Sequence, residues 1–377
     1  MPENGKKGLS VAGGASASLW RLSMRRLRRN RPAMASLIAL AVFYLAAVFA
    51  DFLSPYPYDN EERSHPNAPP TPLRFRRADG SARFLPFVYR TSYTFDENRG
   101  RVYVEDRSAE YPIRFFIPGE EHRILGLIPT RIHFFGVDAP ARIYLLGADY
   151  LGRDRFSRIL YGSRISLSIG LVGVSVSFVI GMLVGGIAGY FGGAVDNALM
   201  RVVEMVMLIP RFYLLLALRA ALPEDISSVR MYFYIVFILS FLGWAGTARV
   251  VRGMVLSLRE QDYVIAARAL GRGHLWVIVR HILPNTLSYA IVSVTLAVPS
   301  GILGESALSL LGLGIQEPYA SWGNMLAKAM NVAEIQFNPE VLWPGAFIFA
   351  VVMCFQFLGD GLRDAFDPMM EASGVKS

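Results

Sequence analysis

Residues 263–285 form a polar, arginine-containing stretch between two long apolar runs, and their types suggest a docking surface. Small residues recur at helical spacing and a glycine follows them, which is typical of a short helix that a partner can contact closely. Arginines in the stretch offer charge to such a partner. The residues that we single out are Tyr263, Ala266, Ala267, Arg268, Ala269, Gly271, Leu283 and Pro284. The alternative is an amphipathic helix that lies on lipid, with its arginines among anionic head groups.

Glu305 is a second candidate, because it lies well inside an apolar run. An ionisable side chain at membrane depth is costly and must face protein or water, so it marks a candidate functional position. A static hydrogen bond to a neighbouring helix satisfies the same requirement, and we favour that structural role. A proton relay needs several aligned carboxylates, and only one is visible. Three further charged residues lie in or near an apolar run: Glu204, Arg211 and Arg219.

Motifs of catalysis are absent from the sequence. There is no GxxxxGK[ST] loop to hold nucleotide phosphates, no HExxH, no GxSxG and no paired Cys/His spacing, and the five histidines are scattered. We therefore expect no catalytic, cofactor-binding or metal-binding residues and no ATP hydrolysis by this chain.

Membrane-spanning helices are the elements that must position these residues. Apolar residues make up 53% of the chain, its mean hydropathy is positive, and several uncharged runs exceed the roughly 20 residues that cross a bilayer. The single cysteine, Cys354, excludes an intrachain disulfide. The sequence predicts an all-α polytopic membrane protein with six transmembrane helices, at residues 32–53, 165–190, 198–221, 231–247, 287–311 and 342–358.

The distribution of charge predicts the orientation of these six helices. The basic segment of residues 1–31 precedes the first helix and holds that end in the cytoplasm, and the apolar run after it is too long for a cleaved signal peptide. Residues 248–281 carry six arginines and two acids, whereas residues 312–341 carry one lysine and three acids. Both termini, including the tail at 369–377, are therefore expected inside. Because the net charge of +8 lies beside the spans, we expect contact with membrane lipid and none with nucleic acid.

Residues 54–144, between the first two helices, are predicted to form an extracytoplasmic insertion, since long translocated segments largely escape the charge rule. Residues 54–72 are rich in Pro, Asn and Ser and are typical of an irregular linker. Residues 73–144 contain short β-branched or aromatic runs broken by Gly, Pro and Asp. They predict a small strand-rich module.

Glycine and proline predict how the helices pack. Gly181, Gly185 and Gly189 recur at every fourth position, which favours close approach of a neighbouring helix. Pro210 and Pro299 lie inside predicted spans and are expected to kink them.

Several motifs together resemble the second permease subunit of oligopeptide, dipeptide and nickel ABC importers, over about residues 144–368. They are Leu146-Gly147-Ala148-Asp149, Gly152-Arg153-Asp154, Ser157-Arg158, Gly162-Ser163-Arg164-Ile165-Ser166-Leu167, Gly192-Gly193-x-x-Asp196, Ser321-Trp322-Gly323 and Gly359-Asp360-Gly361-Leu362-Arg363-Asp364. The stretch 263–271 is similar to the EAA loop of such permeases. Ile265 stands where that loop has glutamate, Ala148 stands in place of a threonine, and the insertion is larger than in typical members.

The resemblance implies a transmembrane core over residues 145–368, with a cytoplasmic coupling loop at about 248–285 that docks into a groove on an ATPase. It also implies a location in the bacterial inner membrane and four kinds of partner: a sister permease in a heterodimer, two cytoplasmic ATPases, an extracytoplasmic substrate-binding protein and lipid. The expected cargo is peptides. The alternatives are an importer of nickel or another small solute and, in a different class, a membrane sensor that relays a signal.

Overall fold

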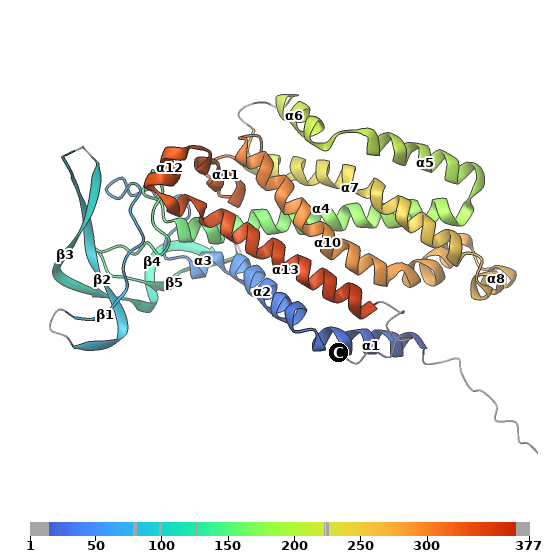
Figure 1. The fold of residues 1–377 in the computed structure, drawn as a ribbon, viewed down its shortest axis with the longest axis horizontal. Coiled ribbons are helices and arrows are strands. Elements are labelled where there is room, and N and C mark those ends of the chain that lie inside the picture. The colour runs from blue at the N-terminus through green and yellow to red at the C-terminus, as the bar shows by residue number, and fades with distance from the viewer. Residues whose placement is uncertain are drawn as a thin grey trace, which may run out of the picture.

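The computed structural model describes residues 15–77, 81–97, 100–124, 127–221, 223 and 226–366. Long helices lie side by side, and a module of strands covers one end of them (Figure 1). The α-helices are α1 (Ala15–Arg29), α2 (Arg31–Val48), α3 (Ala50–Leu53), α4 (Arg155–Phe191), α5 (Gly193–Leu208), α6 (Arg211–Ala221), α7 (Ser228–Leu258), α8 (Asp262–Ala269), α9 (His274–Val277), α10 (Leu283–Leu310), α11 (Trp322–Leu326), α12 (Val332–Phe337) and α13 (Trp343–Phe366). A π-helical turn, η1 (Ile278–Ile282), joins α9 to α10, and two 3₁₀ turns, η2 (Ala327–Met330) and η3 (Pro339–Leu342), flank α12.

Within the described residues, five helical stretches are long and apolar enough to cross a membrane. They are Arg31–Val48, Arg155–Phe191, Ser228–Leu258, His274–Leu310 and Pro339–Phe366. Each overlaps one of the predicted spans. The mostly helical, multi-pass architecture is therefore confirmed.

The stretch 198–221, predicted as one span with a kink at Pro210, is not a single helix. The structure divides this stretch into α5, with 16 residues, and α6, with 11. Pro210 causes the break, because proline lacks an N–H and disfavours helical geometry in the residue before it. Ile209 is accordingly extended, with φ −75° and ψ 116°. Pro299, by contrast, lies within the unbroken α10.

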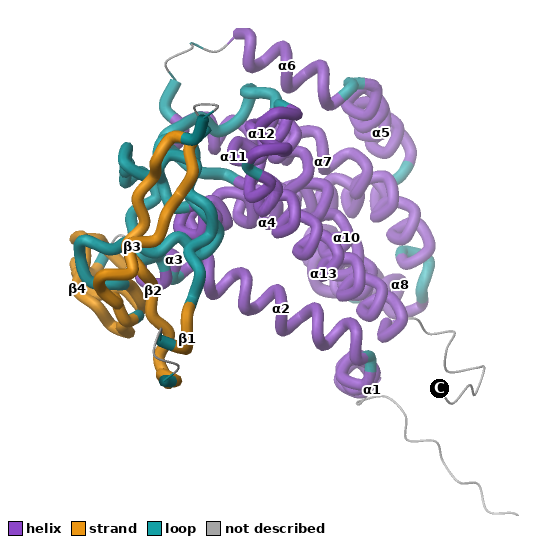
Figure 2. Tube along the Cα trace, turned by 60° about the vertical axis from the view of Figure 1, so that its left-hand side comes forward, coloured by secondary structure: helices purple, strands orange, loops and turns teal. Residues whose placement is uncertain are grey.

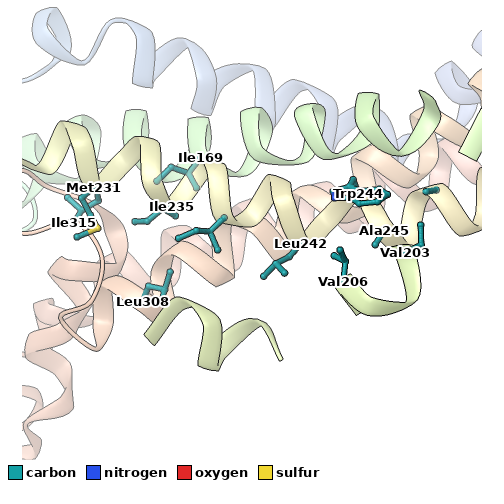
Figure 3. Close-up of a cluster of buried hydrophobic side chains, with 12 residues drawn as sticks. Ile169, Val203, Val206, Met231, Ile235, Leu242, Trp244, Ala245, Leu308 and Ile315 are labelled. Carbon is teal, nitrogen blue, oxygen red and sulfur yellow. The ribbon is translucent and has the colours of Figure 1, made fainter. Parts of the chain in front are cut away.

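The glycine ridge of α4 packs against α7. A Cβ atom at Gly181 would lie 2.9 Å from the carbonyl oxygen of Trp244, and one at Gly189 would lie 2.8 Å from that of Arg252. Only glycine allows the two backbones to approach so closely. The buried cluster beside this contact joins side chains of α4, α5, α7 and α10 (Figure 3). The expected close helix contact is confirmed.

The strand module contains two antiparallel sheets, and its strands are longer than the short runs that predicted it. One sheet has the order β1 (Arg74–Arg76), β2 (Ala82–Phe95), β3 (Arg101–Pro112); the other pairs β4 (Arg114–Ile124) with β5 (Ile128–Gly136). Its core includes Val88, Ile113, Phe135 and Ile143. The module lies at one end of the helices (Figure 2) and contacts α3 and the start of α4, where the ring of Phe156 lies 5.9 Å from that of Phe135.

Residues in and just after α3 anchor this module. The ring of Phe52 in α3 contacts the rings of Phe116 and Phe134, at centroid distances of 6.1 and 5.8 Å. His133 is buried, and its Nδ1 lies 2.6 Å from the carbonyl oxygen of Ser54, just after α3. The strands therefore form a fixed cap on the helices. The α8 segment lies at the opposite end of the bundle (Figure 1).

Candidate functional site

The candidate docking segment folds as α8, a tight turn, α9 and the π-helical turn η1. Gly271 has φ +74°, a left-handed conformation that favours glycine, and no atom lies within 4 Å of where its Cβ would be. Its N–H donates to the carbonyl oxygen of Arg268 at 2.9 Å, and the N–H of Arg272 donates to that of Ala267 at 3.3 Å. Gly271 thus ends α8 as the sequence predicts.

The inner face of the segment packs into the bundle. Val264 is completely buried and Ala267 is only 6% exposed. Both belong to a cluster that also holds Val255 of α7 and Ile282 of η1. The small size of Ala267 therefore serves packing within the chain, which corrects the interpretation that it leaves room for a partner.

Arg268 is exposed, and its side chain also contacts its own chain. Its guanidinium lies over the ring of Tyr190 at 4.4 Å, and its Nε donates to the Tyr190 hydroxyl at 3.2 Å. That hydroxyl is also hydrogen-bonded to His274 Nδ1 at 2.9 Å. Tyr190 lies in the last turn of α4 and is not among the residues singled out from the sequence. An aromatic residue after a glycine ridge gives only a weak signal for such a role.

The outer face of the segment carries exposed apolar side chains. Leu270 is 82% exposed, Leu275 is 68% exposed and Ile265 is 50% exposed. Ala266 and Ala269 are also exposed, and their small side chains add little bulk to this face. Large apolar side chains at the tip of a fixed element are typical of an interaction surface. Leu270 and Leu275 were missed in the sequence, although they flank the predicted turn.

The remaining predicted residues connect the segment to α10. The Tyr263 hydroxyl accepts from Asn285 Nδ2 at 3.3 Å, and partial burial raises the pKa of Tyr263, so its hydroxyl stays protonated. Leu283 packs in the inner cluster, whereas Pro284 is exposed in the first turn of α10. Pro284 cannot donate to the carbonyl of Arg280, and the π-helical turn just before it accommodates this lost bond.

Glu305 lies far from the α8 segment and is fully buried in α10. Its Oε1 accepts from the Ser309 hydroxyl at 2.7 Å, and its Oε2 accepts from the Ser166 hydroxyl of α4 at 3.0 Å. The Ser166 oxygen in turn accepts from the N–H of Trp322 at 3.1 Å, at the start of α11. This geometry supports the structural role and joins three helices.

The motifs of residues 146–158 form a charged joint between the bundle and the strand module. Arg153 lies 2.7 Å from Asp149 and 2.9 Å from Glu317. The backbone is turned sharply at Gly147 and Gly152, each with φ +77°. A Cβ atom at Gly152 would overlap the carbonyl group of Glu62, so glycine is required there.

These features define a class: a multi-pass membrane protein whose helices are packed along a glycine ridge and carry exposed apolar side chains on a short helical segment at one end. The family described as binding-protein-dependent transport system inner membrane component matches residues 181–372, and the N-terminal transmembrane domain of oligopeptide transport permease C matches residues 18–70. The chain belongs to this family of inner-membrane transport components and is a permease subunit of the oligopeptide and dipeptide ABC importer type, not an enzyme.

Curated relatives agree over nearly the whole chain. The dipeptide transport system permease protein of Bacillus subtilis is 32% identical over 92% of this chain and 84% of its own length. The oligopeptide transport system permease protein of Haemophilus influenzae is 32% identical over 93% and 89%. The dipeptide transport system permease protein of Alkalihalophilus pseudofirmus is 38% identical over 95% and 92%.

Proposed function

We propose that the chain forms one half of a heterodimeric pathway for peptide import and that a separate ATPase docks on the α8–α9 surface. The observation that carries this proposal is the pair of exposed leucines, Leu270 and Leu275, on a segment whose other face is buried. The relatives are named for dipeptides and oligopeptides, which favours peptides over nickel as cargo.

The proposed orientation places the α8–α9 surface in the cytoplasm and the strand module outside. The two lie at opposite ends of the bundle (Figure 1), as a membrane between them requires. In this arrangement α5 and α6 together make the sixth crossing, both termini lie inside, and a substrate-binding protein meets the strand module. A sister permease and two ATPases complete the importer.

A rigid connection to the membrane helices supports the coupling role. Arg268 and His274 hold the segment to Tyr190 at the end of α4, and Tyr263 holds it to Asn285 in α10. A force applied to α8 by a closing ATPase therefore moves two long helices together instead of bending a loose loop. Coupled movement of this kind is what alternation between inward and outward states requires.

The test replaces Leu270 with aspartate in the complete importer. A buried unpaired charge in the contact would be costly, so the Leu270→Asp variant should lose at least tenfold in ATP-dependent peptide uptake and co-purify with less ATPase. Leu127→Asp is the matched control for ATPase co-purification, because Leu127 is similarly exposed, at 78%, and lies at the tip of the β4–β5 hairpin, at the other end of the bundle.

Both variants should insert in the membrane in normal amounts, because neither leucine contributes to the core. Full uptake and unchanged ATPase co-purification by the Leu270→Asp variant would count against docking on this surface.

A further inference from the structure

A second surface pocket, separate from the docking segment, lies between α5 and α7. Its volume is about 310 Å³, and its lining consists of Asn197, Met200, Arg201, Glu204, Arg249 and Arg252. Neither the coupling role nor the joint near the strand module uses these side chains as a group. α5 begins at the end of the bundle where α8 lies (Figure 1).

The charges of this pocket do not balance. Arg252 donates to both carboxylate oxygens of Asp196, each at 2.5 Å, and is thereby neutralised. Arg201 lies 3.2 Å from Glu204. Arg249 is exposed and forms no ion pair with any residue that the structure describes. One guanidinium is therefore available to an anion entering the pocket.

Exposed apolar side chains lie next to lining residues in the sequence of α5 and α7. Val202 is 48% exposed, Met205 is 65% exposed and Val250 is 42% exposed. Residues 231–248 of α7 contain no charged side chain, so Arg249 is the first charge after the apolar part of that helix. A cation at this depth lies where phospholipid head groups meet the hydrocarbon core.

We propose that this pocket binds the phosphate head group of an anionic phospholipid, whose acyl chains lie along Val202, Met205 and Val250. The guanidinium of Arg249 matches the charge and geometry of a phosphate, and the Asn197 amide offers a further hydrogen-bond donor. Assignment to the inner leaflet rests on the orientation in the proposed function. The match between the pocket and a phosphate head group does not depend on that orientation.

Lipid binding to the purified, delipidated full chain tests the proposal. Radiolabelled phosphatidylglycerol should bind the wild-type chain more tightly than phosphatidylcholine does. Arg249→Gln should weaken phosphatidylglycerol binding about fivefold, because one arginine near a membrane surface contributes about 1 kcal/mol, and should leave phosphatidylcholine binding unchanged. Arg230→Gln is the matched control, since Arg230 is an exposed arginine at the other end of α7, and it should bind both lipids as the wild type does.

With the purified chain, three outcomes would overturn the proposal: equal affinity for the two lipids, no effect of Arg249→Gln, or competition by millimolar inorganic phosphate as strong as that by the lipid. The last result would make the pocket a site for free anions. Exclusion of the lipid from the assembled importer would also overturn it, because the sister permease would then cover the pocket. The assay involves no transport, so its failure is distinct from failure of the coupling test on Leu270.

Discussion

Asp154 is a residue whose burial predicts an unusual response to pH. It caps α4, where its Oδ2 accepts from the N–H and the hydroxyl of Ser157 at 2.8 and 2.6 Å. Its Oδ1 is buried without a partner among the described residues. Burial raises the pKa of Asp154 from 3.8 to about 6. The folded state therefore holds the proton more tightly than the unfolded state does, and the contribution to stability is lost as the pH rises through about 6.

The Asp154→Asn variant should lose this pH dependence while keeping the helix cap. Relative to the wild type, its stability should be unchanged near pH 4 and higher at pH 7, by up to about 3 kcal/mol, since one pKa unit corresponds to about 1.4 kcal/mol. Thermal unfolding in detergent at pH 4, 5.5 and 7 measures the difference. A variant that is less stable at pH 7 than the wild type would show that the ionised carboxylate stabilises the fold. Asp154→Ala, which removes the cap, should destabilise by about 1 kcal/mol through that loss alone.

Two adjacent alanines of α8 lie on opposite faces, one on the packed inner face and one on the proposed docking face. Ala267 is 6% exposed, whereas Ala266 is exposed. Ala267→Leu overfills the inner cluster and should lower the free energy of unfolding by about 1 to 3 kcal/mol. Ala266→Leu should leave the unfolding temperature unchanged and reduce peptide uptake, because it adds bulk on the docking face. Equal effects of the two substitutions on thermal unfolding would refute the assignment of faces.

At the scale of elements, Glu305 holds α4, α10 and α11 together. Removing its carboxylate leaves the buried hydroxyls of Ser166 and Ser309 without an acceptor, so Glu305→Ala should destabilise by at least about 2 kcal/mol. Glu305→Gln keeps an acceptor of the same shape, so it should lower the free energy of unfolding by less than half as much as Glu305→Ala does. Urea or thermal unfolding in detergent measures the stabilities of the two variants, and Glu204→Ala, at an exposed glutamate, is the control. Abolished uptake in a fully stable Glu305→Gln variant would instead support a proton-relay role.

At the scale of the whole molecule, the proposed orientation predicts which end reacts with an external reagent. Single cysteines at Arg101 and Gly273, in a background with Cys354→Ser, lie in β3 of the strand module and in the turn before α9. Both positions are exposed, and Gly273 has φ −60°, which any residue adopts. A membrane-impermeant maleimide applied to intact spheroplasts should label only the cysteine at position 101. Labelling of position 273 alone would reverse the orientation.

Local properties of the chain were predictable from the sequence. Hydropathy over about 20 residues depends only on neighbours in the chain, so five predicted spans overlap helices that are long and apolar enough to cross a membrane. Turn-forming residues likewise predicted a strand-rich module and the end of α8 at Gly271. Pro210 was the exception. A proline inside a helix can either kink the helix or break it, and the packing around the helix decides between the two.

Contacts between distant segments were decided by tertiary structure. The pattern of small residues at 266–271 cannot say which alanine faces inward, because both faces of so short a helix look alike until α4 and α7 are placed beside it. Likewise, no local pattern pairs Arg268 with Tyr190 or Glu305 with Ser166, which lie 78 and 139 positions apart. By itself the sequence determined which segments are long and apolar enough to cross a membrane, apart from the break at Pro210, and which family the motifs resemble. Only the folded chain decided which side chains stabilise it and which remain exposed to a partner, since burial depends on residues that meet only after folding.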